Sequence, residues 1–444
     1  ILVVTVAYRL NIFGFFTTTN SEAPGNCGML DQVAALDWVQ KNIELFEGSA
    51  DNVTIAGHSS GGISVGLHIL SPLSRGKFSK AIIMSGDAVN SVRTPEQEVS
   101  VIETVADKFQ CLLKPTSKLM ECLRRPQPQV LLDETYEIET WGPIVDADTN
   151  NSSEPFLPAH PRDILEMNNF NAVTLMAGYT SNEQALAYIE AHSKDEDITL
   201  SQSAFETTIT DEIIQSIQKP DNTSTCESKP HLVTDAVLFF YRPYPRSDDP
   251  TIYRDKYLDL QTDRNYAAGL TYLAGKVSKF KKAFVYRFDY RSRTIRVIQD
   301  IPLWAGVPHM FELPFVWGLP HVFGSHINWS NSDKNLADVM MMLIGNFVRT
   351  EEGPSLNNVR WEPFTEVSPG ILVINRTISM NEPESIDYRA LAFWNDYFPT
   401  IVEESMNQCC NATSGAIGRV NWSSKSLVAS GIITLAAFKV LVNY

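Results

Sequence analysis

Residues 55–62 read Ile-Ala-Gly-His-Ser-Ser-Gly-Gly, and this stretch decides the fold. A β-branched run, Val53 to Ala56, leads into it, and a helical pattern follows. Gly-x-Ser-x-Gly between a strand and a helix is typical of a nucleophile elbow, a tight turn that lifts a serine hydroxyl above the edge of a sheet. Side chains on either flank of the turn would collide with it, which accounts for Gly57 and Gly61. We therefore predict that Ser59 is a nucleophile.

The remaining pattern predicts an α/β fold. The first six residues read as a buried strand, and further strands are predicted at Ala81 to Met84, Val173 to Ala177, Ala283 to Phe288 and Ile371 to Ile374. Before Val53, apolar residues step by three and four along one helix face: Met29, Val33, Leu36, Val39 and Ile43. Strand, helix and strand in this order indicate a mostly parallel central sheet flanked by helices. We also expect a helical insertion within residues 195–221.

Composition narrows the function classes. The chain has 444 residues, is 44% hydrophobic and carries a formal net charge of -16. An acidic chain is repelled by phosphate backbones, so we expect no nucleic-acid partner. None of the six cysteines forms a Cys-x-x-Cys pair and no histidines show ligand spacing, so we expect neither a metal nor a cofactor.

The C-terminal region has a different composition, which divides the chain into a catalytic domain over 1–405, a polar spacer over 406–426 and an apolar tail over 427–442. Small residues, a spacer and an apolar tail are the layout of a glycolipid-anchor signal, with Ser414 or Gly415 as the attachment point. The tail is too short for a typical membrane span and contains Lys439. A short span and a buried terminal helix are the weaker alternatives, and membrane contact is expected only through the lipid anchor.

Several segments together resemble the type-B carboxylesterase and cholinesterase family, from Ile1 to about Pro399. They are Tyr8-Arg9-Leu10, Phe13-Gly14-Phe15, residues 25–32 (Gly-Asn-Cys-Gly-Met-Leu-Asp-Gln), the elbow, residues 70–76 and Ser85-Gly86. The resemblance implies an α/β-hydrolase fold and a serine ester hydrolase. Because the chain opens inside a predicted strand, we expect it to be an N-terminally incomplete fragment, without the first strands of that fold.

In this family the catalytic residues follow in the order serine, acid, histidine. The resemblance implies that Glu183, in Gly178-Tyr-Thr-Ser-Asn-Glu-Gln184, is the acid, with Gln184 where the family has glycine. It implies that His309 is the base, with Met310 where the family has a small residue. His58 adjoins the nucleophile and is expected to point away from it. His321 and His326 lie near His309 in the sequence but lack its context.

The oxyanion of an acyl-transfer intermediate needs backbone donors, and the N–H of Ser60 is expected to be one of them. The family supplies the others from a Gly-Gly loop on an earlier strand, and no His-Gly-Gly-Gly run occurs in these 444 residues. We therefore expect the fragment itself to be inactive or barely folded, and the full-length parent to be active.

Two features favour an extracellular setting, either secreted or anchored at the cell surface. Cys111 and Cys122 match the family's small disulfide loop. Glycosylation sequons are predicted acceptors at Asn150, Asn222, Asn328, Asn375 and Asn411, and further sequons lie at Asn151 and Asn421. The partners of Cys27, Cys226, Cys409 and Cys410 stay open, and so does a dimer.

The expected substrate is a small ester. Cholinesterases carry glutamate where this chain has His58, and aromatic residues where it has Glu137 and Glu139. These departures favour a general carboxylesterase over an acetylcholinesterase-like enzyme. A third alternative is a non-catalytic, cholinesterase-like adhesion protein.

Overall fold

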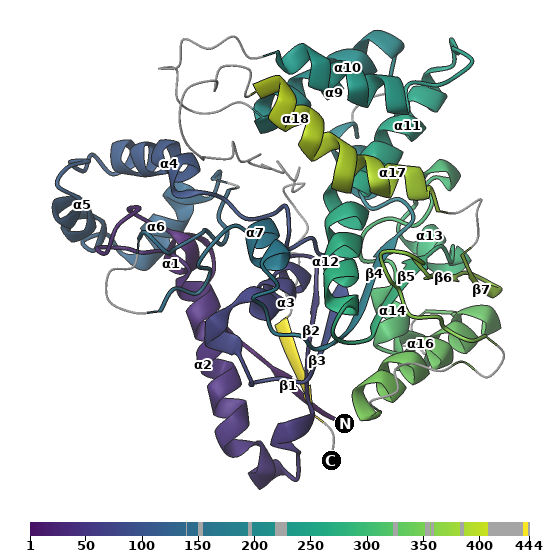
Figure 1. Ribbon diagram of the computed structural model, residues 1–444, viewed down its shortest axis with the longest axis horizontal. Coiled ribbons are helices and arrows are strands. Elements are labelled where there is room, and N and C mark those ends of the chain that lie inside the picture. The colour runs from purple at the N-terminus through teal and green to yellow at the C-terminus, as the bar shows by residue number, and fades with distance from the viewer. Residues whose placement is uncertain are drawn as a thin grey trace.

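A single eight-stranded sheet forms the centre of the molecule (Figure 1). The computed structural model describes residues 1–138, 140–149, 154–193, 198–217, 229–322, 327–350, 356, 359–381, 386–406 and 438–442. The strand order is β1-β8-β2-β3-β4-β5-β6-β7. The strands are β1 (Leu2–Thr5), β2 (Val53–His58), β3 (Lys80–Met84), β4 (Thr174–Thr180), β5 (Ala283–Phe288), β6 (Ile371–Ile374), β7 (Ile378–Met380) and β8 (Phe438–Val442).

The predicted strands are formed, but the first of them, β1, is not buried as predicted, because its residues alternate between half-buried and exposed. The five strands β2 to β6 pair in parallel in chain order, and β7 and β8 run antiparallel to their neighbours. The structure extends β2 and β4 by two or three residues at their C-terminal ends. A mostly parallel sheet brings those C-terminal ends to one edge, where ligand sites of such folds form.

Helices cover both faces of this sheet, because alternate residues of each strand point to opposite sides. Ile83 of β3 belongs to the core on one face, which is covered by α2 (Cys27–Asn42), α3 (Ser60–Leu70) and α12 (Ala268–Ser278). Ile82 belongs to the core on the other face, beneath α14 (Leu313–Val316) and α16 (Asn331–Arg349). The helix predicted from the apolar spacing between Met29 and Ile43 is α2, with its apolar side buried.

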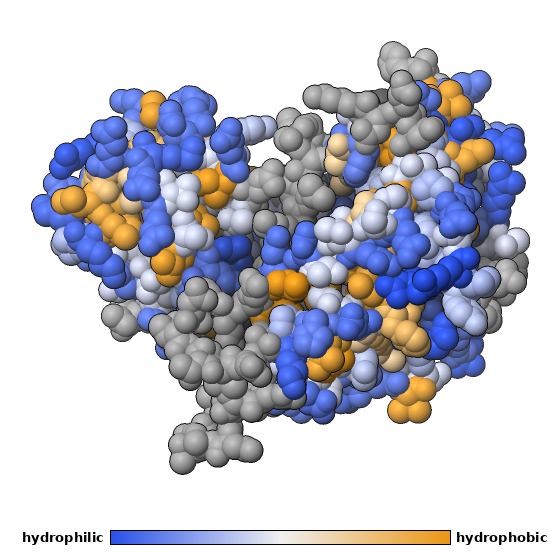
Figure 2. Space-filling model, turned by 90° about the horizontal axis from the view of Figure 1, so that it is seen from above, coloured by the Kyte–Doolittle hydropathy of each residue, from blue (hydrophilic) through white to orange (hydrophobic). Residues whose placement is uncertain are grey.

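Two further groups of helices flank the C-terminal edge of the sheet (Figure 1). One is α9 (Gln202–Ile217), α10 (Pro230–Tyr241), α11 (Pro250–Thr262) and α18 (Phe398–Met406), which share a core with Trp394. The other is α4 (Pro95–Lys108), α5 (Thr116–Leu123) and α6 (Pro128–Thr135). Helix α9 confirms the predicted insertion within the described residues 198–217. Seen from above, the surface is hollowed between the lobe carrying α4 to α6 and the larger body (Figure 2).

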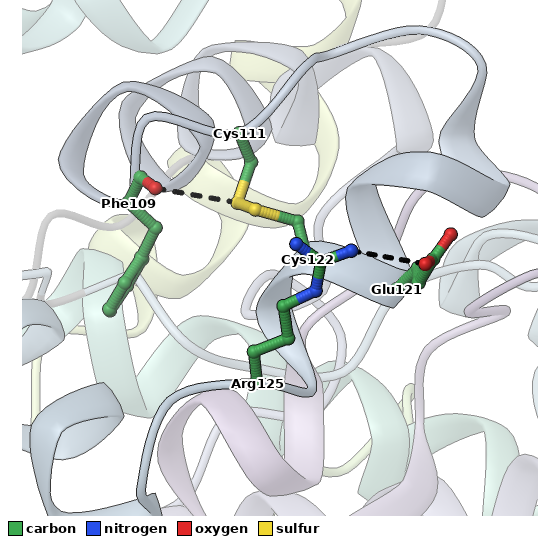
Figure 3. The surroundings of a disulfide bond; sticks show 5 residues. All are labelled: Phe109, Cys111, Glu121, Cys122 and Arg125. Carbon is green, nitrogen blue, oxygen red and sulfur yellow. Dashed lines mark hydrogen bonds and ion pairs between the residues drawn. A yellow bond between two sulfur atoms is a disulfide. The ribbon is translucent and has the colours of Figure 1, made fainter.

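The predicted disulfide is present in the lobe of α4 to α6. Cys111 and Cys122 are bonded at 2.03 Å, beside the ion pair of Glu121 and Arg125 (Figure 3). The bridge closes a short loop between the end of α4 and α5, and it restricts the unfolded chain. Cys27 is the free cysteine of the described part of the chain.

We expect the double substitution Cys111→Ser/Cys122→Ser to lower the free energy of unfolding by about 2–3 kcal/mol, the value for closing a loop of this length. Equilibrium denaturation in urea measures it. Cys27→Ser is the matched control and should change the value by less than about 0.5 kcal/mol. Equal destabilisation by both would contradict the prediction.

The strand β8 was not predicted, and it corrects the reading of the last apolar residues as part of a separate tail. Phe438–Val442 lies between β1 and β2, antiparallel to both. Lys439 is accommodated because its Nζ lies 3.5 Å from the centre of the Trp317 ring. A short apolar run predicts a buried strand as well as it predicts part of a helix or tail. Sequence periodicity therefore could not identify this strand.

The predicted spacer, 406–426, lies outside the described residues except for Met406 at the end of α18, and so does the predicted anchor site. Cleavage at Ser414 or Gly415 would remove β8 from the chain. One mature molecule therefore cannot have both the lipid anchor and the eight-stranded sheet, and the anchor signal stays a prediction. Within the described ranges, no helix has the length and apolar character needed to cross a bilayer.

Candidate active site

The nucleophile elbow is formed as predicted. Strand β2 ends at His58 and α3 begins at Ser60, so Ser59 occupies the turn, with φ 55° and ψ -124°. Residues other than glycine rarely adopt a positive φ, and such backbone strain is typical of functional turns. A Cβ atom on Gly57 would lie 2.1 Å from the carbonyl oxygen of Gly61. This contact confirms that the turn needs glycine at position 57.

Glu183 is buried at the C-terminal end of β4, and described groups hold both of its carboxylate oxygens. Oε1 accepts hydrogen bonds from the Ser85 hydroxyl and the Thr180 N–H, both at 2.7 Å. Oε2 lies 2.6 Å from Nδ1 of His309. This geometry fixes the carboxylate and directs one oxygen at the imidazole. Neither Ser85 nor Thr180 was predicted to contact the acid. Their positions at the ends of two neighbouring parallel strands are the signal that could have found them.

His309 lies on the loop before α14, and the backbone of this loop is tied to the acid. The His309 N–H donates to the Glu183 carbonyl at 3.2 Å, and the Asn182 N–H donates to the Val307 carbonyl at 3.0 Å. Gly306 has φ 61°, and a Cβ atom there would lie 1.8 Å from the Asn182 side chain. The two loops therefore pack at backbone contact and hold the imidazole against the carboxylate.

The electrostatic surroundings of His309 favour its protonated form. Burial lowers the pKa of His309, but the charge and hydrogen bond of Glu183, with the charge of Glu312, outweigh burial and raise this pKa above its ordinary value. An imidazole of this kind is suited to accept a proton and then to hold it against the carboxylate.

Ser59 and His309, the predicted nucleophile and base, lie in the same region. The ring of His58, the residue before Ser59, has its centroid 4.5 Å from that of His309. Both Ser59 and His309 are described, and no hydrogen bond joins them. Hydrogen bonds of catalytic residues often tighten only when substrate binds. The Ser59–His309 hydrogen bond stays a prediction. Ser60 is the first residue of α3, where backbone N–H groups have no acceptor within the helix.

The other histidines near the site are placed differently. His58 is buried beside Glu312, and its ring contacts the ring of His309. The expectation that it points away from Ser59 stays a prediction. Nε2 of His321 lies 3.0 Å from a carboxylate oxygen of Asp338, and no contact between His321 and Glu183 is found among the described residues. His326 lies outside the described residues.

Two departures from the family pattern have a structural account. Gln184 adopts φ -88° at the start of α8 (Ala185–Ala191), so this turn does not require glycine, and its side chain donates to the Tyr266 hydroxyl at 3.0 Å. Met310 adopts φ 74°, in the left-handed region that favours glycine. The chain therefore carries backbone strain at Met310, directly after the base.

The remaining predicted sites are partly described. Asn328 is exposed, and Asn375 is half-buried in the turn between β6 and β7. Neither position is closed to a glycan by burial, and glycosylation stays a prediction. Residues that lie outside the described part of the chain are Asn150, Asn151, Asn222, Asn411, Asn421, Cys226, Cys409 and Cys410.

A mostly parallel sheet with a serine elbow and a buried acid–histidine pair defines an α/β-hydrolase. The sequence profile of the carboxylesterase family matches residues 1–394, and the chain belongs to this family. It is 30% identical over 427 residues to the acetylcholinesterase of Bungarus fasciatus, and 29% identical over 420 residues to the cholinesterase of Mus musculus. These alignments cover 92% and 91% of the chain. The chain spans 66% and 65% of the lengths of the two relatives.

Proposed function

We propose that this chain carries the catalytic site of a serine carboxylic ester hydrolase. Ser59 attacks the ester carbonyl, His309 takes the hydroxyl proton, and Glu183 orients the imidazole and stabilises its charge. His309 returns the proton to the alcohol, which leaves, and water then hydrolyses the acyl-enzyme. The 2.6 Å contact between Glu183 and His309, beside a strained serine elbow, carries this proposal.

The oxyanion in this scheme is held by the N–H of Ser60. Further donors are not assigned, because the 444 residues contain no His-Gly-Gly-Gly run. Each missing donor typically costs about a hundred- to a thousandfold in rate. We propose that the 444-residue chain alone turns over esters much more slowly than a longer form carrying such a loop.

We propose a general carboxylesterase specificity, with choline esters as the second candidate. The relatives named acetylcholinesterase and cholinesterase favour the second candidate. His58 in place of the glutamate before the nucleophile, and the glutamates at 137 and 139, favour the first. The cationic alcohol group of a choline ester is attracted less strongly to a site where an imidazole replaces a carboxylate, because the negative charge of the carboxylate is lost.

The full-length protein tests this choice when matched esters with the same acyl group are compared. We expect kcat/KM for ethyl and phenyl esters to equal or exceed that for the choline ester. A large preference for the choline ester would support the cholinesterase alternative instead. Failure of a serine-reactive phosphonate to label Ser59 would favour the non-catalytic adhesion alternative.

We also propose an extracellular location. The Cys111–Cys122 disulfide supports it, since such bridges persist in oxidising compartments. Detection of attached glycans at Asn328 or Asn375 by peptide mapping would test it. A dimer and a lipid anchor remain proposals that have no support in the described contacts.

A further inference from the structure

A second histidine–carboxylate pair lies next to the proposed catalytic pair. Nε2 of His58 is 3.4 Å from Oε1 of Glu312, and the two side chains are only 4% and 1% exposed. This separation is longer than a well-formed hydrogen bond. Nε2 of His58 has no hydrogen-bond partner among the described groups, and neither do the two carboxylate oxygens of Glu312. Buried polar groups of this kind normally have partners, so their placement requires an explanation.

The pair joins the two segments that carry the nucleophile and the base. His58 is the last residue of β2 and precedes Ser59 directly, whereas Glu312 is three residues after His309, at the start of α14. The rings of His58 and His309 are in contact, with centroids 4.5 Å apart and planes at 42°. Because Glu183 holds Nδ1 of His309, the contact with His58 fixes the ring from a second element.

Glu312 also adds charge to the site. Burial raises the pKa of its carboxyl group, but His58 and His309 outweigh burial and hold this pKa below its usual value. Glu312 is therefore ionised at neutral pH, and its charge is one cause of the raised pKa of His309. The titratable groups that face His309 come from several elements: Glu183 after β4, His58 at the end of β2, Tyr266 in η4 (Asp263–Ala267), and Glu312. Tyr286 of β5 faces both carboxylates and stays neutral, since burial raises its pKa.

We propose that His58 and Glu312 are positioning residues for His309. The ring of His58 keeps the imidazole in the plane that Glu183 requires, and the carboxylate of Glu312 supplies a second negative charge to the imidazolium that forms when Ser59 attacks. This inference rests on the proposed ester hydrolysis at Ser59.

The test uses the full-length protein, with p-nitrophenyl acetate as substrate and active sites counted by phosphonate titration. The base must be neutral to act, so the acid limb of kcat/KM against pH reports the pKa of His309. Glu312→Gln removes the charge and keeps the shape. We expect the midpoint of this limb to move down by about one pH unit, and the plateau kcat per active site to fall about tenfold. His58→Gln keeps a hydrogen-bonding group near Glu312 but removes the ring that contacts His309, and should lower the plateau kcat per active site.

Matched controls are Glu121→Gln and His321→Gln. Both side chains are exposed, and their ion-pair partners are Lys118 and Asp338, not Glu183. If His58 and Glu312 had only a structural role, their substitution would reduce the number of active sites counted with the phosphonate. The kcat per active site and the pH midpoint of kcat/KM would keep their wild-type values. That outcome overturns the proposal. If Glu312→Gln does not fold, Glu312→Asp, which withdraws the charge by one methylene group, is measured in its place, and an unmoved midpoint overturns the role of the charge. Absence of phosphonate labelling in the wild type would instead overturn the proposed function itself.

Discussion

The substitution Ser59→Ala should lower kcat for an activated ester by about 10⁵- to 10⁶-fold in the full-length protein, because it removes the hydroxyl of the residue at the turn between β2 and α3, which follows His58, whose ring contacts His309. The fold should survive, since alanine is no larger than serine and leaves the turn in place. The residual rate would come from the oxyanion donors and substrate binding alone. Ester hydrolysis followed over several hours measures the residual kcat, and circular dichroism checks that the fold is intact.

Covalent labelling makes this test specific to the residue. A phosphonate should modify the peptide containing Ser59 in the wild type, and no site in the variant. Ser100→Ala, on the exposed side of α4, is the matched control and should keep both labelling and turnover. Wild-type activity in Ser59→Ala would remove the basis of the proposed mechanism.

The second large effect is expected for Glu183→Gln, with a fall in kcat of about 10³- to 10⁴-fold. The Thr180 N–H requires an acceptor, so the amide oxygen of the new side chain stays at the former position of Oε1. The amide NH₂ group then faces Nδ1 of His309. This reverses the hydrogen bond, places the imidazole proton on Nε2, and leaves no acceptor for the hydroxyl proton of Ser59.

Burst kinetics with p-nitrophenyl acetate measure this prediction, because both acylation and deacylation need the base. The rate of phosphonate labelling should fall in parallel. Glu190→Gln, on α8 beyond the site, serves as a matched control that should retain full turnover. A Glu183→Gln variant within tenfold of the wild type would show that another group orients His309.

The central strands were predictable because each combines β-branched or aromatic residues with nearly complete burial. β2 and β3, for example, are buried at every residue, and apart from Thr54, His58 and Lys80 their residues are apolar or glycine. The order of strands and helices then fixes the parallel pairing of β2 to β6. β8 was not predictable in this way, since its pairings with β1 and β2 join residues more than 380 positions apart and no local pattern encodes a partner.

The residues of the candidate site also differ in how far the sequence could predict them. A local motif identifies Ser59, because the elbow requires its glycines at fixed spacing. Glu183 and His309 were found through resemblance, and their contact confirms that they lie together. The roles of Ser85 and Glu312 depend on which side chains meet across strands and loops. Such contacts are set by tertiary packing, which spacing along the chain does not reveal.

The position of β8 has a consequence for synthesis on the ribosome. β2 to β6 and their helices are translated before residue 375, and they can pair as they emerge. β1 is translated before them, yet the strand with which it pairs in the described sheet is β8, which is translated after them. The pairings of β8 with β1 and β2 are therefore the last of the described sheet that can form, after β2 to β6 have left the ribosome.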